Sequence, residues 1–132
     1  MIGLDTNVLI RYLTQDDPVQ AARATRLVDS LDEQDPGFVS VVVLVELHWV
    51  LRRAYGVSGR NAADIIRGLL DAKEVSLQEP DAARRALRRV TGAVDFADAL
   101  IGELGTLAGC DYTATLDRRA ARLPTMKLLA AR

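Results

Sequence analysis

MIGLDTNVLI, residues 1–10, carries the first acid of the chain between two apolar stretches. The short apolar run at 2–4 predicts a β-strand, and the apolar residues from Val8 onward predict a helix that begins near Asn7. Asp5 therefore lies where a strand gives way to a helix. An aspartate at this point can cap the helix, or it can serve as a functional acid at the carboxyl end of a strand.

The same alternation of short apolar runs and helical patterns continues along the chain. Asp17-Pro18, Ser40 and Ser58 are helix-start signals, and Gly56 is a stop signal. These patterns predict strands at 37–39, 74–77, 112–116 and 126–129, and helices at 17–31, 40–53, 58–70, 80–89 and 94–108. Strands that alternate with helices predict an α/β fold in which helices sandwich a parallel sheet.

Size and composition suit one compact domain. The chain has 132 residues, of which 49% are hydrophobic, so we expect a single domain over residues 1–132. Its formal net charge of -1 gives no general indication of nucleic-acid binding. Arginines nevertheless occur in adjacent pairs, which suits either solvated helix faces or contacts with an RNA backbone. The pairs are Arg52-Arg53, Arg84-Arg85, Arg88-Arg89 and Arg118-Arg119.

The sequence predicts a soluble, cytoplasmic protein that does not contact a membrane. Asp5 arrives too early for a signal peptide. The longest apolar stretch is interrupted by Glu46 and is shorter than the roughly 20 residues that cross a bilayer. A lone Cys110 cannot form an internal disulfide, which suits a reducing compartment. We expect Cys110 to be a small buried residue between a helix and a strand.

Acids that stand at the ends of apolar stretches, or inside them, are the candidate functional residues. They are Asp5, Glu46, Asp98 and Asp117. Clustered carboxylates repel each other strongly where the dielectric is low, and a divalent cation relieves that repulsion. Mg²⁺ prefers oxygen ligands and also promotes phosphodiester hydrolysis. We therefore expect these acids to gather at one edge of the sheet and to form a metal-dependent nuclease site.

Each acid also has a structural alternative. Asp5 can be a helix N-cap, and a buried arginine can supply a partner for Glu46. Asp95 lies three residues before Asp98 on the same helix face, so it can share the pocket or only cap the helix. Asp117 can be an ordinary turn aspartate.

Four short motifs together resemble the PIN-domain ribonucleases of the VapC type, the toxins of bacterial toxin–antitoxin pairs. Gly3-Leu4-Asp5-Thr6-Asn7-Val8-Leu9-Ile10 resembles the first motif, and Val45-Glu46-Leu47 stands where the family places its glutamate. Asp98-Ala99-Leu100-Ile101 and Thr115-Leu116-Asp117 resemble the third and fourth motifs. The family commonly carries an aromatic residue shortly after the last aspartate, where this chain has Arg118-Arg119-Ala120-Ala121.

The resemblance implies a three-layer α/β/α sandwich with a central parallel sheet. It implies catalytic roles for the four acids, with Mg²⁺, or Mn²⁺ as a substitute, held by Asp5, Asp98 and Asp117. Glu46 is then the expected general base or the residue that orients the attacking water. The residues expected to orient these acids are Thr6, Asn7, Asp95 and Thr115. The implied partners are an RNA substrate, a cognate antitoxin that covers the acidic pocket, and a second copy in a homodimer.

Two other functions fit acids at strand ends. An aspartate-based phosphotransfer domain also uses them, but the phosphatases of that class need a second aspartate where this chain has Asn7. A receiver domain needs a lysine at a strand end, and the only lysines are Lys73 and Lys127. A non-catalytic module could use the acidic pocket to bind a partner's arginines. Such a module would bind its partner in EDTA and would cleave no RNA.

Overall fold

The computed structural model describes residues 1–130, which form two compact units. The first unit is Met1–Gln78 and the second is Glu79–Arg132. The last two residues of the expected domain, 131 and 132, lie outside the described residues. Every strand pairing in the described chain is parallel. The expected α/β class, with a parallel sheet flanked by helices, is confirmed.

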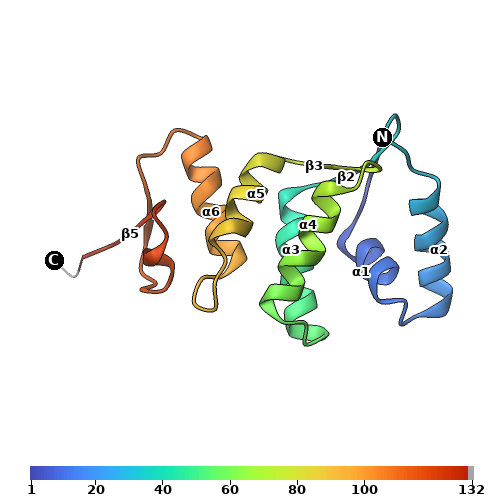
Figure 1. Ribbon diagram of the computed structural model, residues 1–132, viewed down its shortest axis with the longest axis horizontal. Coiled ribbons are helices and arrows are strands. Elements are labelled where there is room, and N and C mark those ends of the chain that lie inside the picture. The colour runs from blue at the N-terminus through green and yellow to red at the C-terminus, as the bar shows by residue number, and fades with distance from the viewer. Residues whose placement is uncertain (131–132) are drawn as a thin grey trace. The chain divides into compact units, whose positions relative to one another are not determined.

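The first unit contains a three-stranded sheet with the order β1-β2-β3 (Figure 1). Its elements are β1 (Ile2–Gly3), α1 (Thr6–Thr14), α2 (Pro18–Asp29), β2 (Gly37–Val39), α3 (Val41–Ala54), α4 (Gly59–Asp71) and β3 (Val75–Leu77). Helix α1 packs against α2 and α3, and α3 packs against α4. The core of this unit is shared by α1, β2, α3 and α4. Its fully buried side chains are Leu9, Val39, Leu44, Leu47, Leu51 and Ile66.

The second unit contains two packed helices and a two-stranded sheet. Its elements are α5 (Pro80–Arg89), α6 (Phe96–Leu107), β4 (Thr113–Thr115), the 3-10 helix η1 (Ala120–Arg122) and β5 (Met126–Leu128). Helices α5 and α6 pack against each other, and Ala83 and Ala86 of α5 and Phe96 and Leu100 of α6 are all buried. Helix α6 thereby gains a fixed position next to α5 and β4.

Local capping signals account for three of the helix starts. The side chains of Asp17, Ser40 and Ser58 accept hydrogen bonds from the backbone N–H groups of Gln20, Val43 and Asn61, respectively. These bonds satisfy N–H groups that have no partner within the helix. The helix starts that we predicted from these residues are confirmed.

Cys110 is exposed, so the prediction that it is buried was wrong. The residue does lie between α6 and β4 as expected. It follows Gly109, whose φ of +96° turns the chain out of the helix, and connecting segments of this kind run over the surface. No described helix combines the length and the apolar character that a membrane crossing requires.

Candidate functional site

The candidate acids are divided between the two units. Asp5 and Glu46 belong to the first unit, and Asp98 and Asp117 belong to the second. Within residues 1–130, no three His, Cys, Asp or Glu side chains are grouped closely enough to hold a metal ion. The convergence of all four carboxylates stays a prediction, and each half of the site is described by itself.

Asp5 follows β1 and occupies the N-cap position of α1 with an extended backbone. Its main-chain carbonyl accepts from the N–H groups of Val8 and Leu9, which starts the helix. Its carboxylate makes no capping hydrogen bond and is exposed. Capping therefore does not explain why this position carries an acid, and the carboxylate oxygens are available for a cation or a substrate.

Glu46 lies on α3 and accepts a hydrogen bond at Oε1 from the hydroxyl of Thr6, a buried residue in the first turn of α1. The side chain of Glu46 is exposed, so the apolar neighbours along the chain do not enclose it, and the buried environment in which a buried arginine was the structural alternative is not present. The cause is helical geometry, because Glu46 points away from the buried face formed by Leu44, Leu47 and Leu51. Thr6 fixes one oxygen of Glu46 and leaves the second oxygen free for chemistry.

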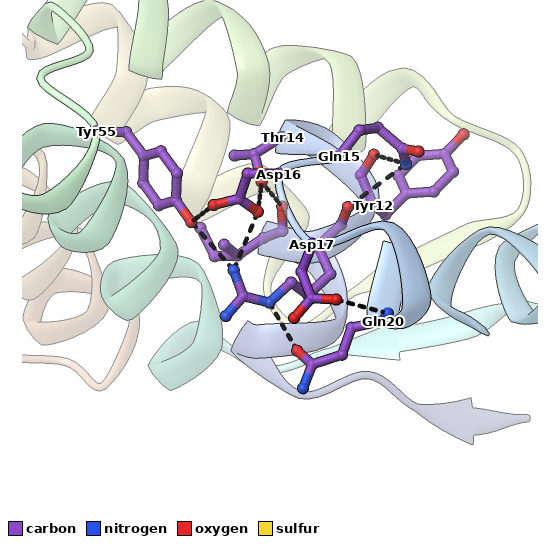
Figure 2. A network of polar contacts seen from close by, with 9 residues as sticks. Tyr12, Thr14, Gln15, Asp16, Asp17, Gln20 and Tyr55 are labelled. Carbon is purple, nitrogen blue, oxygen red and sulfur yellow. Dashed lines mark hydrogen bonds and ion pairs between the residues drawn. The ribbon is translucent and has the colours of Figure 1, made fainter. Parts of the chain in front are cut away.

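A second contact between α1 and α3 lies near the other end of α1 (Figure 2). Arg11 Nη1 donates to Asp16 Oδ1 at 3.0 Å and to Tyr55 Oη at 3.3 Å, and Tyr55 Oη donates to Asp16 Oδ2 at 2.8 Å. Arg11 Nε also donates to Gln20 of α2 at 2.8 Å. The hydroxyls of Tyr55 and then Thr14 lower the pKa of Asp16. The network fixes α1, and with it Asp5 and Thr6, against both neighbouring helices.

In the second unit, Asp95 occupies the N-cap position of α6 and Asp98 lies in its first turn. The carbonyl of Asp95 accepts from Ala99 N, but its carboxylate makes no capping bond. Partial burial, followed by the negative charges of Asp95 and Asp117, raises the pKa of Asp98. These three acids therefore share a negative field. None of the causes of the raised pKa of Asp98 is a positive charge.

Asp117 follows β4 in a turn that its own side chain stabilises. Asp117 Oδ1 accepts from Arg119 N at 2.8 Å, and the hydroxyl of Thr115 accepts from Asp117 N at 3.0 Å. The turn role that we considered for Asp117 is therefore present. It occupies one carboxylate oxygen and fixes the direction of the other, so it is compatible with a second role as a ligand.

Sequence reasoning missed Glu103, whose exposed fraction of 2% makes it a buried acid on α6. Arg85 Nε donates to Glu103 Oε2 at 3.1 Å, and Arg89 Nε donates to Glu103 Oε1 at 2.8 Å. The sequence carried part of the signal, because Glu103 stands within an apolar helix and Arg85 and Arg89 lie four residues apart on one helix face, but it did not show that the two helices pack together. These two arginines hold α5 to α6 through their Nε atoms.

The candidate residues suit a hard cation. Asp5, Asp95, Asp98 and Asp117 offer carboxylate oxygens, which Mg²⁺ prefers over nitrogen or sulfur. Two of these carboxylates, those of Asp5 and Asp95, are not used as helix caps. Burial and then repulsion from Asp95 and Asp117 raise the pKa of Asp98, and a cation beside it would offset both effects. The donor chemistry therefore fits Mg²⁺ or Mn²⁺.

Comparison with known proteins agrees with this chemistry. A model of the PIN domain matches residues 2–125, a range that crosses both units and includes all four candidate acids. No curated protein matches the chain. PIN domains are typically nucleases and generally depend on Mg²⁺. Because the match extends over nearly the whole chain, the protein belongs to the PIN domain family.

Proposed function

We propose that this PIN-family protein is a Mg²⁺-dependent endoribonuclease and that it acts as the toxin of a toxin–antitoxin pair. The observation that carries the proposal is the acidic environment of Asp98 within a family of nucleases. A carboxylate beside two other acids is unfavourable for the fold alone, and it is useful once a cation and a phosphodiester are bound.

Asp5, Asp98 and Asp117 would hold the cation. When bound, Mg²⁺ would neutralise charge on the phosphodiester and lower the pKa of water. The free oxygen of Glu46 accepts a proton from the attacking water, while Thr6 keeps the other oxygen in place. Thr115 orients Asp117 through the backbone. Asn7 and Asp95 lie close in sequence to Asp5 and Asp98, and we assign to them the role of orienting the ligating acids.

The alternative of a phosphotransfer domain has less support. Lys127 lies in the middle of β5, over the ring of Tyr112 at 5.2 Å, and Lys73 precedes β3. Neither lysine stands at the carboxyl end of a strand, where a receiver domain needs one. The acidic binding module remains the second candidate, and its partner binding would not depend on a metal.

Cleavage of total RNA by the purified chain tests the proposed activity. We expect fragments in Mg²⁺ or Mn²⁺, and none in EDTA or with Asp98→Asn. RNA that stays intact in every metal, together with partner binding that persists in EDTA, would favour the binding module instead.

Besides the acidic pocket that the antitoxin is expected to cover, the first unit offers a second candidate surface for it. A pocket of about 310 Å³ is formed by α1, α2, α4 and β3, and its lining includes Leu9, Leu13, Leu31, Ile65 and Leu69. Apolar side chains of a partner protein would fill such a pocket.

The toxin role predicts that production of the wild-type chain stops bacterial growth and that Asp98→Asn does not. Equal growth with both would contradict it.

We also propose a homodimer formed by helices of the N-terminal half. The hydrophobic content of 49% suggests more apolar surface than one small domain buries, and Val19 of α2, which is 64% exposed, is one residue that a second copy could cover. One chain has a mass of 14.4 kDa. Light scattering at tens of micromolar should report twice that mass. A single-chain mass at that concentration would contradict the dimer.

A further inference from the structure

Helix α3 presents one continuous outer face. Val42, Glu46, Trp49 and Arg53 are spaced at i, i+4, i+7 and i+11, so they lie along the same side of the helix. Val42 is 71% exposed and Trp49 is 57% exposed. Large aromatic side chains are usually well buried, which makes Trp49 the most unusual member of this face. The tryptophan lies one helical turn from Glu46, the proposed general base.

The ring of Trp49 already has a cation beside it. The guanidinium carbon of Arg53 lies 5.5 Å from the ring centroid, which is a cation–π contact. This contact restrains an exposed aromatic ring and places a positive charge next to it. A restrained ring with a neighbouring guanidinium suits a nucleotide, because the ring can stack on the base and the charge can pair with a phosphate.

We propose that Trp49 and Arg53 form a subsite for one unpaired nucleotide of the RNA substrate, with the base stacked on Trp49. The inference rests on the proposed ribonuclease activity and adds a requirement to it, namely that the substrate is single-stranded near the point of cleavage. It also adds a stacking contact to the RNA-backbone contacts that the paired arginines suggest.

Glu46 argues against a second copy of the chain as the occupant of this face. The glutamate lies between Val42 and Trp49, so a protein surface that covered both apolar residues would also bury its carboxylate. In a two-fold dimer the same acid would be buried from both copies, which is costly without cationic partners. An RNA strand leaves the carboxylate in a hydrated environment.

Trp49 is the only tryptophan of the chain, so its fluorescence reports on this subsite alone. We would titrate non-cleaving Asp98→Asn protein with single-stranded oligoadenylate and with an RNA duplex of equal length. Stacking should quench the fluorescence with the single strand and leave it unchanged with the duplex. Quenching by both RNAs, or by neither, would overturn the stacked nucleotide.

Variants in the otherwise wild-type chain give the matched kinetic test. Trp49→Ala should raise KM for single-stranded RNA by about 5- to 150-fold with little change in kcat, and Trp49→Phe should retain most of the affinity. Tyr112→Ala is the control, because it removes the exposed aromatic–cation pair of the second unit and should leave KM unchanged. A wild-type KM in Trp49→Ala would contradict the subsite.

Failure of this inference differs from failure of the proposed function. A wild-type chain that cleaves RNA without any fluorescence response contradicts only the subsite. A chain that neither cleaves nor binds RNA contradicts the ribonuclease itself. Fluorescence that changes with protein concentration alone, together with loss of a dimer in Trp49→Ala, would assign this face to a second copy and overturn the nucleotide.

Discussion

Asp16 and Asp98 show how single carboxylates are affected in opposite ways by their surroundings. Hydrogen bonds from Tyr55 and Thr14 favour ionised Asp16 and lower its pKa. Burial and the neighbouring acids disfavour ionised Asp98 and raise its pKa. The first acid is therefore part of what stabilises the fold, whereas the second costs stability unless a cation binds.

Asp16→Asn should reduce stability near neutral pH and not in strong acid. The folded-state pKa of Asp16 is below its ordinary value of 3.8, so its contribution is present above that pH and is lost as the pH falls through the folded-state pKa. Urea unfolding of both proteins from neutral to acid pH measures this. Tyr55→Phe removes the largest cause of the shift and should show the same pattern in part. A stability difference that is constant over the whole range would contradict the network.

Asp98→Asn should melt at a higher temperature than wild type in EDTA at neutral pH. The folded-state pKa of Asp98 is raised above 3.8, so the unfolded chain ionises first and stability falls as the pH rises from 3.8 through the folded-state pKa. Thermal melts in EDTA at several pH values test this, with Asp29→Asn on α2 as an exposed control. Mg²⁺ at a hundred times its Kd should stabilise wild type by about 2.7 kcal/mol and the variant by less. Equal responses to Mg²⁺ would show that Asp98 is an ordinary helix residue.

At the scale of elements, local signals predicted most of the fold. Ser40 caps α3, and the apolar pattern that continues to Leu51 correctly indicated a helix despite the β-branched start of this segment. Pairings between elements were not predictable in the same way. The contact of Arg85 and Arg89 with Glu103 depends on how α5 packs against α6, and no local spacing determines that packing. The helix η1 was also missed, because three residues are too few to show a period.

Gly102 of α6 should be intolerant of a side chain for a packing reason. A Cβ at this position would lie 2.9 Å from the Cβ of Thr125 and nearer still to its hydroxyl. We expect Gly102→Ala to destabilise the protein by about 1–2 kcal/mol, because overpacking outweighs the gain in helix propensity. Gly68→Ala in α4 is the matched control, since a Cβ there meets nothing within 4 Å. It should be neutral or stabilising by up to about 1 kcal/mol. Chemical denaturation of both variants gives the comparison, and equal effects would contradict close packing at Gly102.

For the whole molecule, the sequence predicted the family better than it predicted the surroundings of each acid. The order of four short motifs was enough to indicate a PIN domain, and the match over residues 2–125 confirms it. The bond between Glu46 and Thr6 could not be predicted, because it depends on how α1 packs against α3. The division of the acids between two units has a functional consequence. If the acids of both units serve one reaction, removing an acid from either unit should abolish cleavage to the same extent.

Cleavage kinetics of a defined single-stranded RNA in Mg²⁺ test that central claim most directly. The proteins to compare are wild type, Asp5→Asn, Asp98→Asn, the double variant, and Asp29→Asn as a control. Residues that act as one unit have non-additive effects, so each single change at Asp5 or Asp98 should reduce the rate by at least about a hundredfold. The double variant should then be no slower than the slower single variant, and Asp29→Asn should match wild type. A wild-type rate in either single variant, or losses that multiply in the double variant, would contradict the claim that both acids serve one Mg²⁺-dependent reaction.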